Sequence, residues 1–165
     1  MSERSCRTEG GASCGRCCID LAIRVPEIKK PAGVPCSKLE DDGFGGHQCS
    51  IYDQQRPNLC EGYLCGWRVG ELGDNDRPDK SGVLVTPVEP QEETVNAILK
   101  VREAGYALWL VKKTHGTDVP EDRLKSALRR LGKHAVIIEK NNFVGGPNKA
   151  VRIFLRWIQR DRRDR

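Results

Sequence analysis

Three cysteines lie within five positions near the start of the chain, at Cys14, Cys17 and Cys18. A core does not need three thiols this close together, so each is a candidate disulfide partner, metal ligand or reactive nucleophile. The other five cysteines are Cys6, Cys36, Cys49, Cys60 and Cys65, and the last 100 residues contain none. The chemistry that we predict for this protein therefore belongs to its first 65 residues.

The spacing of these cysteines indicates metal ligands. The C-x₂-C spacing of Cys14 and Cys17 lets two thiolates converge on one ion. Neighbouring side chains usually diverge, so Cys17 and Cys18 serve two different ions, or one ion and one free thiol, more easily than a single site. The seven cysteines from Cys14 to Cys65, with Cys6 or His47 as an eighth ligand, are enough for two closed four-coordinate sites. Seven ligands alone require a bridging thiolate or leave an open position, which would permit Lewis-acid chemistry.

The ligand type leaves the identity of the metal open between zinc and iron. Thiolates suit both zinc and iron–sulfur clusters. The ferredoxin runs C-x₂-C-x₂-C-x₃-C-P and C-x₄-C-x₂-C are absent. We therefore predict zinc as the cofactor, with iron or an iron–sulfur cluster as the alternative.

The composition predicts a cytoplasmic globular protein. The chain has 165 residues, of which 38% are hydrophobic. Its longest apolar runs, YALWLV and AVII, are far shorter than the roughly 20 residues of a membrane helix. The first residues, MSERSCRTEGGASC, lack the apolar stretch of a secretion signal. Because the cytoplasm keeps thiols reduced, we predict that the cysteines bind metal rather than form disulfides. Because the apolar runs are short, we expect no membrane partner.

The charge of the chain is concentrated in its basic C-terminal tail. From Lys149 to Arg165 there are seven Lys or Arg and two Asp, a net charge of +5, which equals the net charge of the whole chain. Such a tail can contact phosphate or an acidic protein partner. No stacking aromatics or nucleic-acid motif accompany it, so a solvated terminus is favoured over nucleic-acid binding.

The chain divides into two halves of different texture, and we predict an α+β fold. Residues 1–80 are rich in turn formers and lack long periodic segments, which predicts an irregular cysteine-cluster region nucleated by metal. A structural zinc can contribute on the order of 10 kcal/mol to folding such a region. Residues 81–165 predict a small α/β region of order β-α-β-α-β-α that ends in the basic tail.

Periodicity and capping signals place the elements of the second half. Strands are predicted in the segments GVLVTPVE, YALWLVKK and HAVIIE. A first helix over 91–105 carries Val95, Ile98, Leu99 and Val101 on or near one face and ends at Gly105. A second helix is predicted with Asp118 as its cap, a buried face formed by Leu124, Ala127, Leu128 and Leu131, and Gly132 as its end. The segment NNFVGGPN is predicted to be a loop and KAVRIFLRWIQR a final helix.

The pattern CGRCC … C … CSIYDQQRP … C … C resembles the YkgJ-like cysteine-cluster family, which is described as a zinc- or iron-chelating domain. The resemblance covers the chain from about Cys14 to Trp67. It implies a metal-ligand role for seven residues: Cys14, Cys17, Cys18, Cys36, Cys49, Cys60 and Cys65. Many members have a further cysteine at the position of Gly11, so Cys6 is its candidate substitute here.

The resemblance implies chelation without implying a reaction. A flagellin lysine methylase carries a related cysteine cluster, which makes a metal-dependent enzyme an alternative. Against this alternative, no radical C-x₃-C-x₂-C motif, Ser-His-Asp arrangement, H-E-x-x-H motif or phosphate loop occurs in the chain. Within IYDQQRP, Tyr52 is expected to pack over the site, Pro57 to stiffen the approach to Cys60, and Arg56 to bind a carboxylate or loop carbonyls or to neutralise thiolate charge.

Overall fold

The computed structural model describes residues 4–6, 13–43, 46–70, 72–88, 95–131, 135–138, 142–143 and 152–153. Packing divides the chain into two compact units. The first comprises Met1–Leu84 with Lys113–Val119, and the second comprises Val85–Lys112 with Pro120–Arg165. That residues 1–80 and 81–165 form separate domains stays a prediction. No pattern in the sequence indicated that the segment Lys113–Val119 belongs to the first unit.

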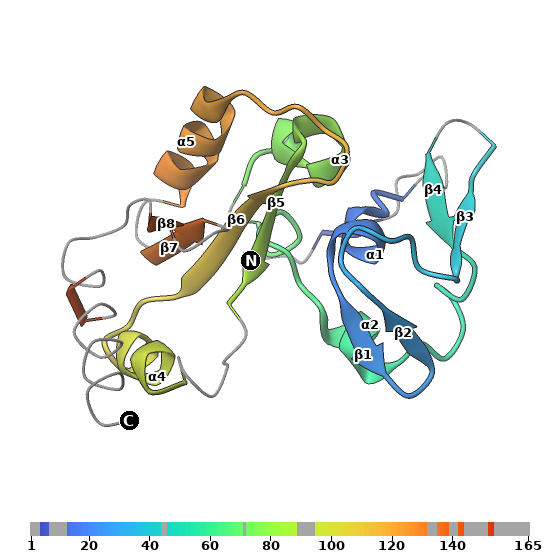
Figure 1. Cartoon of the computed structure of the whole chain (residues 1–165), viewed down its shortest axis with the longest axis horizontal. Helices are drawn as coiled ribbons and strands as arrows, with labels where there is room; N and C mark the ends of the chain where they lie inside the picture. The colour runs from blue at the N-terminus through green and yellow to red at the C-terminus, as the bar shows by residue number, and fades with distance from the viewer. Residues whose placement is uncertain are drawn as a thin grey trace. The chain divides into compact units, whose positions relative to one another are not determined.

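Short elements build the first unit (Figure 1). Its helices have five residues or fewer and its strands have three, and they comprise α1 (Arg16–Asp20), β1 (Ile23–Val25), β2 (Ile28–Lys30), β3 (Leu39–Asp41), β4 (His47–Cys49), α2 (Asn58–Gly62), the 3₁₀ turn η1 (Asp74–Asp76) and α3 (Pro78–Ser81). Strands β1 and β2 pair antiparallel, as do β3 and β4. The two hairpins make this unit more regular than the sequence predicted.

The hydrophobic cluster of the first unit is small and contains sulfur. Its buried members are Ile23, Ile28 and Cys36. The partly buried residues around them are Cys18, Val25, Leu39, Ile51 and Cys60. Three of these eight residues are cysteines. The packing that buries apolar surface in this cluster therefore also positions three thiols.

Two buried charged side chains fix α1 in the first unit. The Lys30 ammonium donates hydrogen bonds to the carbonyls of Ile19, at 3.0 Å, and of Leu21 and Pro31, which satisfies carbonyls at the C-terminal end of the helix. The Asp20 carboxylate accepts hydrogen bonds from the Arg16 guanidinium, at 3.1 and 3.2 Å. Neither charge was expected from the sequence.

Asp20 also ties α1 to the segment Lys113–Val119. Its carboxylate accepts a hydrogen bond from the backbone N–H of His115 at 2.5 Å. Arg16 donates to the carbonyl of the same residue at 2.7 Å. The helix that carries Cys17 and Cys18 is therefore held by a residue almost 100 positions later in the chain.

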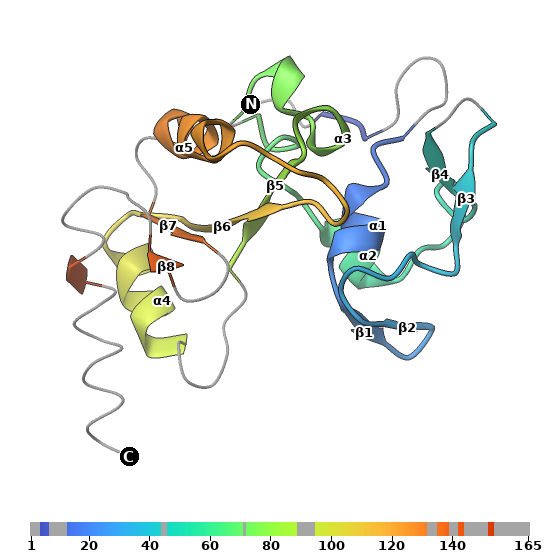
Figure 2. The same ribbon diagram turned by 45° about the horizontal axis from the view of Figure 1, so that its top comes forward.

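A mixed sheet with the order β5-β6-β7-β8 lies C-terminal to these elements (Figure 1). The elements are β5 (Val83–Pro87), α4 (Val95–Glu103), β6 (Leu108–Lys113), α5 (Glu121–Arg130), β7 (Ala135–Ile138) and β8 (Asn142–Phe143). Strands β6 and β7 are parallel, with Leu108 opposite Ala135, and β8 returns antiparallel to β7. Figure 2 shows α4 and α5 on opposite sides of β6 and β7.

Strands β5 and β6 run in opposite directions. Val88 N–H donates to the Leu108 carbonyl and Thr114 N–H donates to the Gly82 carbonyl, so residue numbers rise along one strand as they fall along the other. Only the step from β6 through α5 to β7 is a parallel crossover. The α+β class predicted from the sequence is confirmed at the level of mixed helices and small sheets.

The predicted helices are present with corrected limits. In α4, Ile98 and Val101 are fully buried, whereas Leu99 is 46% exposed, so its placement on the buried face was wrong. Gly105 ends this helix with a φ of 83°, and Tyr106 N–H donates to the Val101 carbonyl, as in a glycine-terminated C-cap. The predicted residues 91–94 lie outside the described part of the chain.

The capping residue predicted for α5 was also wrong. The helix begins at Glu121, after Pro120, and the exposed Asp118 side chain lies 4.0 Å from the Lys113 ammonium. Pro120 fixes its own φ and suits the first turn of a helix, which moves the start past Asp118. Ala127 is buried as predicted, and so is Leu131, which directly follows the helix. The side chains of Leu124 and Leu128, and Gly132, lie outside the description.

The core of the second unit is independent of the cysteines. It consists of Ala97, Ile98, Val101 and Leu108, with Val88, Tyr106 and Ile153 packed against it. The loop predicted for NNFVGGPN was wrong at Asn142–Phe143, which form β8. Arg152 and Ile153 are helical, whereas the rest of the predicted final helix and the basic tail lie outside the description. Among the described residues, no helix is long and apolar enough to span a bilayer.

Candidate metal centre

All eight cysteines lie in the first unit as free thiols. Cys17 and Cys18 are on α1, Cys49 ends β4 and Cys60 is in α2. The other four, Cys6, Cys14, Cys36 and Cys65, are in the connecting segments. Cys14, Cys36 and Cys65 are buried, with exposed fractions of 7% or less.

One set of four thiols, which we call the Cys6 group, consists of Cys6, Cys14, Cys17 and Cys65. Burial, and then the charge of Cys65, raises the pKa of Cys6 to about 11. Burial raises the pKa of Cys14 to about 12, with a smaller effect from Cys6. The pKa of Cys17 is raised well above its usual value by a hydrogen bond with Cys18, by burial and by the charges of Cys18, Cys6 and Cys14. Each thiol is therefore close enough to feel the charge of another member.

A second set, which we call the Cys18 group, consists of Cys18, Cys36, Cys49 and Cys60. Burial raises the pKa of Cys49, and the charges of Cys18 and Cys36 raise it further. Burial also raises the pKa of Cys60, followed by the charges of Cys18, Cys36 and Cys49. Cys18, Cys36 and Cys60 also share the hydrophobic cluster of this unit. The charges of the other members of this group thus raise the pKa values of Cys49 and Cys60.

The two groups meet at Cys17 and Cys18. Their sulfur atoms are 4.0 Å apart. A hydrogen bond from the Cys17 thiol, aided by the charges of Lys30 and Arg56, lowers the pKa of Cys18 to about 7. The two thiols of these consecutive residues are thus hydrogen-bonded to each other, so their side chains do not diverge as the sequence predicted.

Backbone N–H groups are directed at sulfur in both groups. In the Cys6 group, Cys14 accepts a hydrogen bond from the N–H of Arg16, and Cys65 accepts one from the N–H of Trp67. In the Cys18 group, Cys36 accepts a hydrogen bond from the N–H of Lys38 at 3.4 Å. Cys49 likewise accepts one from the N–H of Ile51. Cys65 also accepts from the N–H of Arg68, three residues after it, and Cys14 also accepts from the N–H of Asp79. Such hydrogen bonds stabilise the thiolate form.

Cationic side chains accompany each group. Lys30 and Arg56 lower the pKa of Cys18, and Arg68 and Arg77 lower that of Cys6. The Arg56 guanidinium lies 4.4 Å from the centre of the Tyr52 ring, which holds it beside the Cys18 group. This placement agrees with the expectation that Arg56 neutralises thiolate charge.

The donor atoms fit a soft metal ion, although they are not closed around one. Thiolate sulfur is the preferred ligand of zinc and of iron–sulfur clusters. Within the described part of the chain, no three His, Cys, Asp or Glu side chains lie close enough together to hold one ion. To coordinate one ion with four sulfur atoms, the thiols of either group must move closer together.

No family model, curated protein or solved structure matches this chain. The resemblance to the YkgJ-like cysteine-cluster family therefore stays a prediction that rests on motif spacing. The contacts of Cys6 and His47 favour Cys6 as the eighth ligand. The charges of Cys65 and Cys18 raise the pKa of Cys6, so its thiol lies near theirs. The His47 backbone pairs with Ser13 in a β-bridge, and its side chain packs against Gly15.

Sequence reasoning missed the cations Lys30, Arg68 and Arg77. Lys30 follows another lysine at the end of a three-residue strand, and nothing in that pattern marks it as buried. Arg77 forms a two-point ion pair with Asp79, at 2.6 and 2.7 Å, and lies close enough to Cys14 and Cys6 to feel their charges. A buried cation beside a predicted thiolate cluster is found only when the fold is known.

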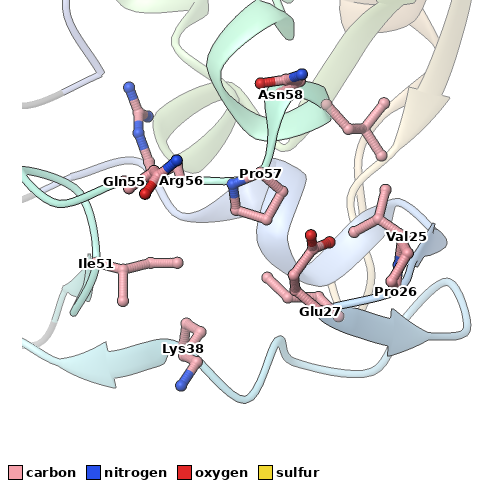
Figure 3. A pocket seen from close by; sticks show the side chains of 11 residues that line it. Val25, Pro26, Glu27, Lys38, Ile51, Gln55, Arg56, Pro57 and Asn58 are labelled. Atoms are coloured by element: carbon pink, nitrogen blue, oxygen red, sulfur yellow. The ribbon is translucent and has the colours of Figure 1, made fainter.

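A pocket of about 720 Å³ adjoins the Cys18 group (Figure 3). The turn between β1 and β2 lines one side, and Ile51 with the segment 55–59 lines the other. Its wall residues Val25, Ile28 and Ile51 belong to the cluster that also contains Cys18, Cys36 and Cys60. In Figure 3 the Glu27 carboxylate points from the turn toward Pro57, whereas the Lys38 amino group points away.

Proposed function

We propose that this protein is a metal-binding protein that holds two zinc ions through its cysteines, one in the Cys6 group and one in the Cys18 group. The observation that carries the proposal is the set of backbone N–H groups directed at sulfur. Two cysteines in each group accept at least one backbone N–H: Cys14 and Cys65 in the Cys6 group, and Cys36 and Cys49 in the Cys18 group. Hydrogen bonds from the protein to ligand sulfur orient metal ligands and stabilise their charge.

The charge balance supports one divalent ion in each group. Four thiolates around a divalent ion carry a net charge of about −2. Lys30 and Arg56 act on the Cys18 group, and Arg68 and Arg77 act on the Cys6 group. The two cations beside the Cys18 group offset that charge, whereas beside the Cys6 group Asp79 pairs with Arg77 and offsets part of the positive charge. Such compensation lowers the cost of burying charge.

The size of the first unit supports a folding role for the metal. Strands of three residues and helices of four or five are too short to be stable alone. The hydrophobic cluster around Ile23 and Ile28 has eight members, of which three are cysteines, and Trp67 and Leu72 are buried elsewhere in the unit. Bound metal would add to the stabilisation that this apolar burial provides.

Metal analysis of anaerobically purified protein tests the proposal. We expect about two zinc ions per chain and a colourless solution, because zinc has no d–d absorption and eight thiolates fill two tetrahedral sites. Replacement by Co²⁺ should give the strong visible absorption of tetrahedral cobalt–thiolate sites. Brown protein with iron and acid-labile sulfide would instead support the iron–sulfur alternative. Protein that is folded and free of metal would contradict both.

A matched pair of variants tests the ligand assignment. Cys18→Ser should remove about one zinc ion per chain, since it deletes one ligand of the Cys18 group. His47→Gln should retain both ions, because His47 is engaged with Ser13 and Gly15 rather than with a thiol group. Loss of zinc in His47→Gln without loss of folding would overturn the choice of Cys6.

A further inference from the structure

The pocket of Figure 3 lies within the first unit, between the turn of the β1–β2 hairpin and the segment 55–59. Its volume of about 720 Å³ is in the range of small-molecule sites, which measure about 300–1,000 Å³. None of the described residues that line it is a cysteine, so the proposed metal sites make no use of it.

Backbone hydrogen bonds fix both walls of this pocket. In the hairpin, Val25 pairs with Ile28 around the two-residue turn 26–27, whose proline restricts its own φ. On the opposite wall, the Pro57 carbonyl accepts a hydrogen bond from Cys60 N–H at 2.8 Å, where α2 begins. The pocket is therefore formed before any ligand arrives.

Apolar side chains form much of the lining. Ile28 is buried, and Val25 and Ile51 are half-buried. Leu59 is 41% exposed, so an apolar side chain of the pocket still faces solvent. A ligand with an apolar body would remove this surface from water, which is favourable.

The charge that a ligand would meet in the pocket is negative. In Figure 3 the Glu27 carboxylate points toward Pro57 on the opposite wall, and among the described residues it has no hydrogen-bond or ion-pair partner. The Lys38 amino group points away. The Arg56 guanidinium lies 4.4 Å from the centre of the Tyr52 ring, and its Nε is shielded from solvent, so this nitrogen does not face the open pocket.

We propose that this pocket binds a small organic ammonium ion, whose charge pairs with the Glu27 carboxylate and whose apolar body packs against Val25, Ile51 and Leu59. Glu27 is exposed, so the ion pair selects the charge of the ligand, while the apolar contacts supply most of the affinity. The size of the site favours a small molecule over a protein. Eleven residues line the pocket, whereas a stable protein interface takes about 20–30 residues from each partner.

NMR titration of the isoleucine, valine and leucine methyl groups of the full chain tests the proposal. The probes are hexylammonium, hexanol and hexanoate, which share one apolar body and differ in charge. Hexylammonium should bind about threefold more tightly than hexanol, and hexanoate more weakly than hexanol, because an exposed ion pair has a modest effect. Glu27→Gln should weaken hexylammonium binding about threefold and leave hexanol binding unchanged. Leu59→Ser should weaken the binding of all three probes about threefold.

Glu40→Gln is the matched control, because Glu40 is an exposed glutamate of β3 that does not line the pocket. It should leave the binding of every probe unchanged. Tighter binding of hexanoate than of hexylammonium, equal binding of hexylammonium and hexanol, or equal losses in Glu27→Gln and Glu40→Gln would overturn the cation site. Absence of methyl shifts with every probe would overturn the pocket as a binding site. Metal content is measured separately, so any of these results leaves the proposed zinc sites standing.

Discussion

Removal of the metal from the wild-type protein should unfold the first unit and leave the second unit folded. The expected loss is large, on the order of 10 kcal/mol, because structural zinc sites contribute folding free energy of that size. The elements of the first unit have five residues or fewer. The second unit keeps a core of Ala97, Ile98, Val101 and Leu108, none of which depends on a thiol.

Hydrogen exchange of backbone amides, before and after anaerobic treatment with a chelator, measures this difference. Protection should be lost in α1, in both hairpins and in α2, and retained in α4 and β6. Restoration of zinc in the presence of reductant should restore protection. Uniform loss of protection in both units would show that the second core does not stand alone. Protection that survives in the first unit would show that the metal has no folding role.

Asp20→Ala should destabilise the protein by about 3 kcal/mol or more. The Asp20 side chain is only 2% exposed, and it pairs with the Arg16 guanidinium at 3.1 Å. Its removal leaves the half-buried Arg16 guanidinium and the N–H of His115 without this acceptor. Breaking a buried ion pair from one side costs about 3–5 kcal/mol, since the remaining charge stays desolvated. The midpoint and slope of urea unfolding give the change in free energy.

The pair Lys100–Glu103 provides the control for this prediction. It has a shorter distance, 2.6 Å, but its side chains are 42% and 61% exposed. Glu103→Ala should therefore change the free energy of unfolding by less than about 0.5 kcal/mol. Equal effects of the two substitutions would contradict the buried role of Asp20. Asp20→Ala should also lower zinc affinity, because Asp20 fixes the helix that carries Cys17 and Cys18.

The sequence predicted the elements of the second half well, because that half is periodic. The alternation and β-branched content of 83–87 and 108–113 are present as β5 and β6, and Gly105 ends α4 as its conformational freedom requires. The errors concern the first residue of α5 and one side chain of α4. Pro120 displaced Asp118 from the start of α5. Leu99 is exposed because it lies about 100° around the helix from Ile98, outside the face formed by Ala97, Ile98 and Val101.

The first half could be predicted only through its cysteines. A strand of three residues has no measurable period, so β1 to β4 left no signal. The spacing of the cysteines predicts that they act together as ligands, and it does not indicate which of them are neighbours. That arrangement depends on Cys36 N–H reaching the Cys18 carbonyl and on Cys14 N–H reaching the Cys6 carbonyl, which are contacts between distant parts of the sequence.

The membership of Lys113–Val119 in the first unit bears on how the protein folds during its synthesis. The backbone N–H that Asp20 requires belongs to His115, so a nascent chain that ends at Leu84 still lacks it. The cysteines leave the ribosome early, yet the helix that carries two of them cannot be fully fixed until about 30 further residues have emerged. A fragment that stops at residue 84 should accordingly contain every thiol and still behave as an incomplete domain.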